Sequence, residues 1–104
     1  MIYTVTLNPA IDKTVVIENF TAGSVNRVGS VREDAGGKGI NVSKCLQNLG
    51  QESVAAMVLA GQTGKRLDAM LKAMKIHMLR VHTEGENRTN LKIIDPVKGE
   101  NTDI

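Results

Sequence analysis

Alternation of apolar and polar side chains predicts short strands at the beginning of the chain. Residues 2–7 are rich in β-branched and apolar side chains, and the Asn-Pro pair directly afterwards is typical of a strand end. Residues 14–17 and 25–31 show a similar pattern on either side of a turn at residues 22–24. Because these two segments also carry polar positions, we expect them to form an antiparallel sheet with one face partly in solvent.

A different periodicity in the middle of the chain predicts two amphipathic helices with one strand between them. Apolar residues recur at helical spacing in two stretches, Val42, Cys45, Leu46 and Leu49 in the first and Leu67, Met70, Leu71 and Met74 in the second. We expect these side chains, Cys45 included, to be buried. Gly50 is the expected end of the first helix, and Thr63 is a candidate N-cap of the second. The continuous apolar run at residues 54–59 is typical of a buried parallel strand.

Three more segments have the character of strands, at residues 77–81, 90–94 and 102–104. Strands that alternate with helices predict right-handed crossovers and a parallel sheet, so the expected fold class is α/β. Two helices cover only part of such a sheet, and the chain ends inside the last of these segments, so we expect a piece of a longer protein. The alternative is a complete small domain that pairs its strand edge with a second copy.

The composition of the 104 residues is that of a globular protein and disfavours several partners. Apolar residues make up 41% and charged residues 23%, unlike a disordered chain. Only 2% are aromatic, which disfavours stacking on nucleic acid, and the net charge of +2 is spread without a basic stripe. No apolar run approaches the length of a membrane span. The single Cys45 excludes an internal disulfide, and we expect the protein in the reducing cytoplasm.

A glycine-rich stretch at residues 35–43 (AGGKGINVS) is the most informative candidate for a binding site. Clustered glycines are costly inside a helix or strand, so we expect residues 35–39 to be a loop that opens the first helix. The free N–H groups of such a helix start attract anions, Lys38 adds a positive charge, and Asn41 adds an amide. The stretch fits neither the phosphate loop of nucleoside triphosphatases nor the dinucleotide fingerprint, which disfavours a small dinucleotide-binding domain. Loop chemistry alone leaves both a phosphate site and a structural turn open.

Four motifs together resemble the N-terminal portion of a known family. They follow one another in the family's order over essentially the whole chain, as TVTLNPAID (residues 4–12), VNRV (25–28), AGGKGINV (35–42) and NRTNLK (87–92). They resemble ribokinase-like sugar kinases of the phosphofructokinase B type, and within it the branch of 1-phosphofructokinases and tagatose-6-phosphate kinases. Members of that family are considerably longer, so the resemblance implies that this chain lacks their C-terminal half.

The resemblance also implies a division of the chain into a core and a lid. The core is the N-terminal part of a ribokinase-like, Rossmann-type α/β domain, at about residues 1–8 and 35–87. A small β-sheet lid follows at about residues 12–31 and 88–104. The sugar of these kinases lies between core and lid, and lid strands often pair two subunits, so a homodimer through the lid strands is implied.

Seven substrate-binding residues are implied by position in these motifs. The residue matching Asp12 accepts hydrogen bonds from sugar hydroxyls, and we expect Asp12 directly after the first strand. The glycine stretch contacts the sugar through residues matching Gly36, Gly37, Lys38 and Asn41. The arginine matching Arg88, on a lid strand, binds the phosphate already on the sugar, and Arg27 on the earlier lid strand is a further candidate. Without the resemblance, a turn residue would be an equally good interpretation of Asp12, and a solvated strand charge would be the favoured interpretation of Arg88.

The implied activity is transfer of the γ-phosphoryl group of ATP to fructose 1-phosphate, which gives fructose 1,6-bisphosphate. Tagatose 6-phosphate is the alternative substrate, and a non-catalytic sugar-phosphate-binding or dimerisation module is the alternative of a different class. ATP and Mg²⁺ are implied cofactors, bound mainly by the C-terminal half. We therefore expect no catalytic or metal-binding residue in this chain, no kinase activity of the isolated chain, and neither nucleic acid nor membrane as a partner.

Overall fold

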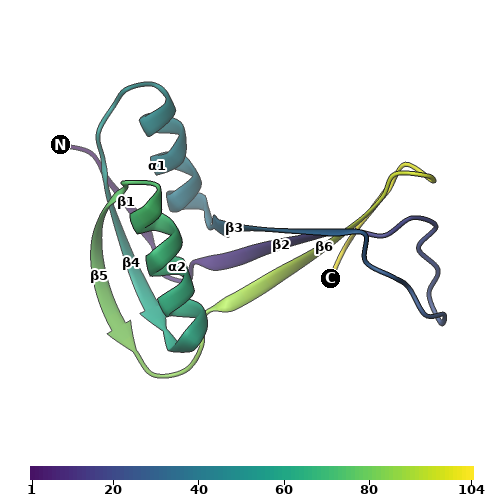
Figure 1. Cartoon of the computed structure of the whole chain (residues 1–104). Coiled ribbons are helices and arrows are strands. Elements are labelled where there is room, and N and C mark those ends of the chain that lie inside the picture. The colour runs from purple at the N-terminus through teal and green to yellow at the C-terminus, as the bar shows by residue number, and fades with distance from the viewer. The chain divides into compact units, whose positions relative to one another are not determined.

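The computed structural model describes all of residues 1–104, and the chain forms two compact units. The first unit comprises Met1–Ile11 and Ala35–Arg88, and the second comprises Asp12–Asp34 and Thr89–Ile104. Each unit is thus built from two separate segments of the sequence, as the colours of Figure 1 show. Neither helix combines the length and apolar character that crossing a membrane would require.

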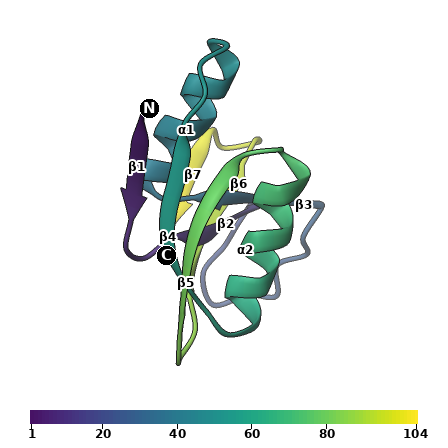
Figure 2. The ribbon, with the colours of Figure 1, turned by 90° about the vertical axis from the view of Figure 1, so that its left-hand side faces the viewer.

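The first unit is a three-stranded parallel sheet with two helices. Its strand order is β1-β4-β5, and both strand pairs are parallel (Figures 1 and 2). Along the chain the elements are β1 (Tyr3–Thr6), α1 (Lys38–Asn48), β4 (Val54–Ala60), α2 (Gly61–Ala73) and β5 (His77–Thr83). The expected α/β class and the parallel strand at residues 54–59 are confirmed, because β4 is the central strand of this sheet.

One face of this sheet forms the core of the first unit. Alternate residues of β4 are buried, and they pack with fully buried residues of both helices in a cluster that includes Ala55, Met57, Leu59, Ile40, Leu67 and Leu71. The other face carries apolar side chains that are 57% to 65% exposed, namely Tyr3, Val5, Leu79 and Val81. Parallel sheets are normally covered on both faces, so this second face is an uncovered apolar surface.

Helix α1 presents a different face to the sheet from the one predicted. Val42 is 51% exposed and Leu49 77% exposed, and Cys45 is exposed rather than buried. The buried residues of α1 are Ile40 and Ser43. The Ser43 hydroxyl lies 2.7 Å from the Thr4 hydroxyl of β1, so a small polar residue packs where the pattern predicted a large apolar one. Apolar periodicity alone therefore misassigned the inner face of this helix.

Helix α2 confirms the predicted apolar face at Leu67 and Leu71, but Met74, also predicted to be buried, is 38% exposed, and the predicted cap is wrong. Leu67 and Leu71 are fully buried. The helix begins at Gly61, with Ala60 at the N-cap position, so Thr63 lies inside the first turn. The Thr63 backbone N–H donates a hydrogen bond to the Glu86 carboxylate. Glu86, 23 positions further along the chain, thus accepts the backbone N–H at the helix start in place of an N-cap side chain from Thr63.

The second unit contains most of a four-stranded sheet with its own small core. The strand order is β3-β2-β6-β7, and β6 and β7 are antiparallel. Its strands are β2 (Ala10–Val16), β3 (Ser30–Gly36), β6 (Arg88–Asp95) and β7 (Glu100–Asp103). The core consists of the buried residues Val15, Ile17 and Ile93, with Phe20 and Leu91 packed against them.

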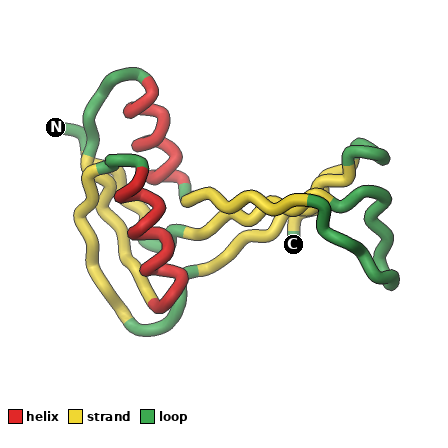
Figure 3. The backbone as a smooth tube through the Cα atoms, in the orientation of Figure 1, coloured by secondary structure: helices red, strands yellow, loops and turns green.

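The predicted strand at residues 25–31 is wrong, because most of that segment is a loop (green in Figure 3) and β3 begins only at Ser30. The side chain of Asn26 explains the difference. Its Oδ1 accepts the Thr21 backbone N–H, and its Nδ2 donates to the carbonyls of Thr21 and Ser24, at 2.9 to 3.0 Å. These bonds close the segment on itself and use backbone groups that a strand would have offered to a neighbour.

Asp95, the last residue of β6, is bonded to the segment that follows β2. Its carboxylate accepts backbone N–H groups of Asn19, Phe20, Val97 and Lys98 at 2.8 to 3.1 Å. Burial raises the pKa of Asp95, but these hydrogen bonds outweigh burial and hold the pKa below its usual value. Asp95 therefore ties the segment after β2 and the turn after β6 to one charged group.

Candidate functional site

The predicted site residues are distributed over both units. Gly36, Gly37, Lys38, Asn41 and Arg88 belong to the first unit, and Asp12 and Arg27 belong to the second.

The start of α1 is open and carries no negative charge. Gly36 is the last residue of β3 rather than part of a loop, because the backbone stays extended up to this residue. Gly37 then occupies the N-cap position with a φ of 126°, a conformation that favours glycine. No side chain caps the helix, and its first turn contains no acidic residue. Lys38 and Asn41 are exposed at this end, so the positive end of the helix is free to meet an anion.

The glycines of this segment also have a structural role, because α1 begins directly against β1. A Cβ at Gly37 would lie 2.7 Å from the Thr6 side chain, and one at Gly39 would lie 2.8 Å from the Val5 carbonyl oxygen. Neither distance is compatible with a side chain at these positions. The glycine-rich sequence therefore places the start of α1 at the carboxyl end of β1.

Gly39→Ala is expected to destabilise the fold by about 1–3 kcal/mol, because the new methyl group would overlap the backbone of β1. Thermal unfolding followed by circular dichroism measures the change. Gly29→Ala is the control, since its nearest neighbour is the Val16 carbonyl at an ordinary 3.5 Å. An unchanged midpoint for Gly39→Ala would contradict the close packing of α1 on β1.

Arg88 lies at the carboxyl end of the neighbouring strand. It is the first residue of β6 and follows Asn87, whose side chain bonds to the Val58 carbonyl and the Ala60 N–H of β4. Because β1 and β4 are adjacent and parallel, the start of α1 and Arg88 lie at the same edge of one parallel sheet. Ligands of open α/β sheets bind at this edge.

Asp12 occupies a different place from the one predicted. It lies inside β2 rather than after β1, because the chain resumes a strand at Ala10 directly after Pro9. Its Oδ1 accepts a hydrogen bond of 3.0 Å from Nδ2 of Asn90 on β6. Sequence analysis did not single out Asn90. The signal available was its alternation with the apolar Leu91, which places Asn90 on the polar face of its strand.

Arg27 lies in the loop before β3 and not on a strand, because the Asn26 side chain bonds to the backbone of this segment. It is exposed and belongs to the lining of a shallow hollow formed by the residues of this loop. Within the second unit, the Asp12 carboxylate bonds to Asn90 and not to Arg27.

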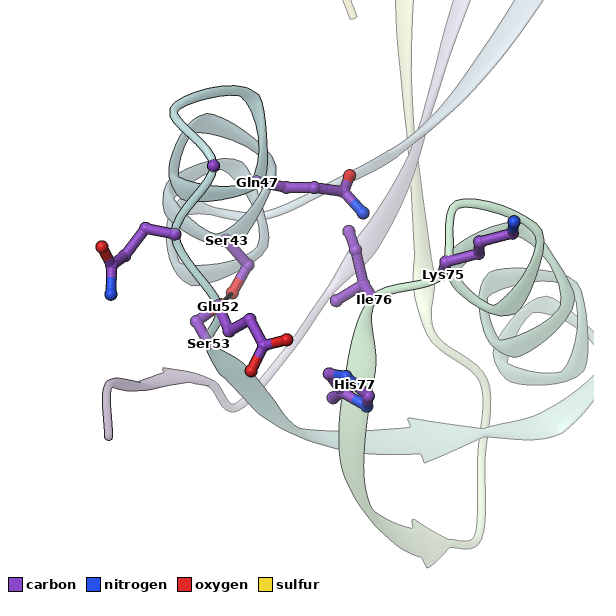
Figure 4. Close-up of a pocket in the computed structure, with 9 residues that line it drawn as sticks. Ser43, Gln47, Glu52, Ser53, Lys75, Ile76 and His77 are labelled. Atoms are coloured by element: carbon purple, nitrogen blue, oxygen red, sulfur yellow. Dashed lines mark hydrogen bonds between the residues drawn. The ribbon is translucent and has the colours of Figure 1, made fainter.

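A separate hollow of about 230 Å³ lies at the opposite, amino end of the parallel sheet (Figure 4). Its lining includes Gln47 of α1, Glu52 and Ser53 before β4, and Lys75 and His77 around the start of β5. None of the seven predicted site residues lines it. Its position at the amino ends of the strands also disfavours it as the main site.

Comparison with known proteins identifies the family. Residues 5–104 match the pfkB family carbohydrate kinase. The 1-phosphofructokinase of Xanthomonas campestris pv. campestris is 45% identical over 103 residues, which cover 97% of this chain and 32% of that protein. The tagatose-6-phosphate kinase of Staphylococcus epidermidis is 33% identical over 104 residues, which cover 100% of this chain and 33% of that protein.

A solved structure of Escherichia coli phosphofructokinase-2 in complex with fructose-6-phosphate has a TM-score of 0.93 and 27% identity, covering 99% of this chain and 34% of that one. Another structure of the same enzyme is described as its tetrameric inhibited form. The chain therefore belongs to the pfkB family of carbohydrate kinases, as the resemblance of its motifs implied. It spans about a third of the length of the curated relatives that it matches.

Proposed function

We propose that this chain supplies the sugar-phosphate-binding part of an ATP-dependent kinase. The reaction is transfer of the γ-phosphoryl group of ATP to a hydroxyl of fructose 1-phosphate, which gives fructose 1,6-bisphosphate and ADP. The observation that carries the proposal is the open start of α1 beside Lys38, in a chain of the pfkB family. Fructose 1-phosphate is favoured over tagatose 6-phosphate because the identity to the Xanthomonas 1-phosphofructokinase is 45%, against 33% for the tagatose-6-phosphate kinase.

Each proposed role follows from the chemistry of its residue. Arg88 binds the phosphate already on the sugar, because a planar guanidinium donates two parallel hydrogen bonds to a phosphate. Lys38 and the N–H groups at the start of α1 stabilise negative charge on the sugar phosphate, and Asn41 contributes an amide. Asp12 accepts hydrogen bonds from sugar hydroxyls, and the bond from Asn90 fixes its carboxylate. Arg27 is a further candidate for the phosphate.

We propose that ATP and Mg²⁺ are bound mainly by the part of the kinase that this chain, about a third of its relatives' length, does not include. No group of three or more His, Cys, Asp or Glu side chains in this chain could hold a metal ion. When bound, ATP would supply the γ-phosphoryl group and Mg²⁺ would neutralise negative charge on the phosphates. The residues of this chain bind and orient the sugar phosphate, so that a hydroxyl faces the phosphorus.

We further propose that the second unit is the lid and that its strands pair two subunits. Its core is small, and every residue of β7 is exposed, which leaves this strand free to meet a partner. Light scattering of the protein encoded by the complete reading frame tests this pairing. A dimer is the expected result, and a monomer at micromolar concentration would contradict it.

The proposed location is the cytoplasm. A phosphorylated sugar as substrate and the unpaired Cys45 are both consistent with it.

The activity is tested with the protein encoded by the complete reading frame that contains these residues, called here the complete gene product. ADP release is measured with ATP and either fructose 1-phosphate or tagatose 6-phosphate. We expect turnover with both and a higher kcat/KM for fructose 1-phosphate. If neither sugar phosphate were turned over, the proposed function would be contradicted. The 104-residue chain alone is expected to release no ADP, and measurable release would contradict the division of roles.

A further inference from the structure

Asn87 is a buried polar residue that continues the sheet where β1 has ended. It is 7% exposed. Its Oδ1 accepts the Ala60 N–H at 2.7 Å, its Nδ2 donates to the Val58 carbonyl at 3.2 Å, and its own backbone N–H donates to the Ala60 carbonyl at 3.2 Å. The register of β1 on β4 ends at Met57, so Asn87 takes up backbone groups of β4 that β1 does not reach.

Glu86, the preceding residue, is held at the start of α2. Its carboxylate accepts the Thr63 backbone N–H, and this bond lowers the pKa of Glu86 below its usual value. The adjacent glycines make room for both residues. A Cβ at Gly64 would lie 2.8 Å from Asn87 Oδ1, and one at Gly61 would lie 2.6 Å from Glu86 Oε1. We call Glu86 and Asn87, with their bonds to β4 and α2, the 86–87 clasp.

The clasp ends immediately before Arg88, which is the last residue of the first unit. Figure 1 shows the chain passing the start of α2 on its way from β5 to β6. Asn87 is fixed to β4 by one backbone and two side-chain hydrogen bonds, and the Glu86 carboxylate is bonded to the first turn of α2. The Cα of Arg88 is therefore held at the carboxyl edge of the sheet by contacts that do not involve Arg88 itself.

We propose that Glu86 and Asn87 are positioning residues for Arg88, which hold its guanidinium where it can bind the phosphate of the sugar. The proposal rests on the proposed function. A long side chain on a fixed backbone loses less conformational freedom on binding than one on a mobile backbone. A displacement of about 1 Å at a binding group is enough to cost a large factor in rate. In this proposal the clasp acts on affinity for the sugar phosphate through Arg88.

The test is a double-mutant cycle in the complete gene product with Asn87→Ala, Arg88→Ala and the double variant. KM is measured for fructose 1-phosphate and for ATP at a temperature where circular dichroism shows all variants folded. We expect Asn87→Ala to raise the KM for the sugar phosphate about tenfold and to leave the KM for ATP unchanged. In the Arg88→Ala background the same change is expected to have almost no further effect.

Two further variants separate positioning from simple destabilisation. Leu71→Ala removes buried core contacts in the same unit without touching the clasp, so it is expected to leave both KM values unchanged. Glu86→Ala is expected to raise the KM for the sugar phosphate by a smaller factor than Asn87→Ala, and Glu86→Gln, which keeps an acceptor oxygen, is expected to restore it. Glu86 is exposed, so these variants test the proposal even if Asn87→Ala does not fold.

Additive effects of Asn87→Ala and Arg88→Ala, or an equal rise in KM with Leu71→Ala, would overturn the positioning role while leaving the proposed function intact. An unchanged KM for the sugar phosphate in Arg88→Ala would overturn the phosphate role of Arg88 and the clasp proposal with it. Turnover with neither sugar would instead overturn the proposed function, so the two failures are distinguishable.

Discussion

Arg88→Ala in the complete gene product is expected to raise the KM for fructose 1-phosphate by about ten- to hundredfold and to leave the KM for ATP unchanged. A charge-assisted hydrogen bond to a phosphate contributes about 1.5–3 kcal/mol, which corresponds to that range. Lys38→Ala is expected to act in the same direction, because Lys38 adds its charge to the open start of α1. Initial rates at varied concentrations of each substrate measure both effects.

The matched control for Arg88 is Arg32→Ala. Arg32 is an exposed arginine on β3, and its Nε donates a hydrogen bond of 2.9 Å to the Asp34 carboxylate. An exposed ion pair contributes little to stability, so this change is expected to leave both KM values as they are. An equal loss of affinity for ATP and sugar in Arg88→Ala, or no loss for either, would count against the assigned role.

Leu71→Ala is expected to lower the free energy of unfolding by about 2–5 kcal/mol. Leu71 is fully buried on α2, in the core that β4 shares with both helices. The truncation removes apolar contacts and leaves a cavity that the neighbouring side chains fill only in part. Chemical denaturation followed by circular dichroism gives the free energy directly.

Leu49→Ala removes the same atoms at a site that is 77% exposed. It is expected to change the free energy of unfolding by less than about 0.5 kcal/mol. If both variants lost stability equally, the inner and outer faces assigned to the two helices would be wrong. The pair thus tests the correction made to α1 as well as the confirmed face of α2.

Local patterns in the sequence predicted those elements whose formation depends mainly on their own residues. The apolar run of β4 and the stripe of Leu67 and Leu71 are continuous signals, and the structure contains both elements where they were predicted. The strand expected at residues 25–31 failed because one side chain, Asn26, competes for the backbone. The inner face of α1 failed because small residues such as Ser43 pack there, and apolar periodicity does not detect them.

In the candidate site, too, local patterns predicted neighbouring residues but not contacts between distant ones. The glycine-rich stretch could be found from sequence because its residues are neighbours in the chain. The bond between Asn90 and Asp12 joins residues 78 positions apart, and that between Asn87 and Ala60 joins residues 27 apart. Such pairs follow from the register of strands, which a single sequence does not specify. The roles assigned to Asp12, Arg27 and Arg88 stay predictions from the family's motifs.

The most direct test of sugar-phosphate binding by these residues is a crystal structure of the complete gene product with fructose 1-phosphate bound. The account predicts that the phosphate accepts hydrogen bonds from the Arg88 guanidinium and that Asp12 accepts one from a sugar hydroxyl. A sugar phosphate held at another place, with neither Arg88 nor Lys38 in contact with its phosphate, would contradict it.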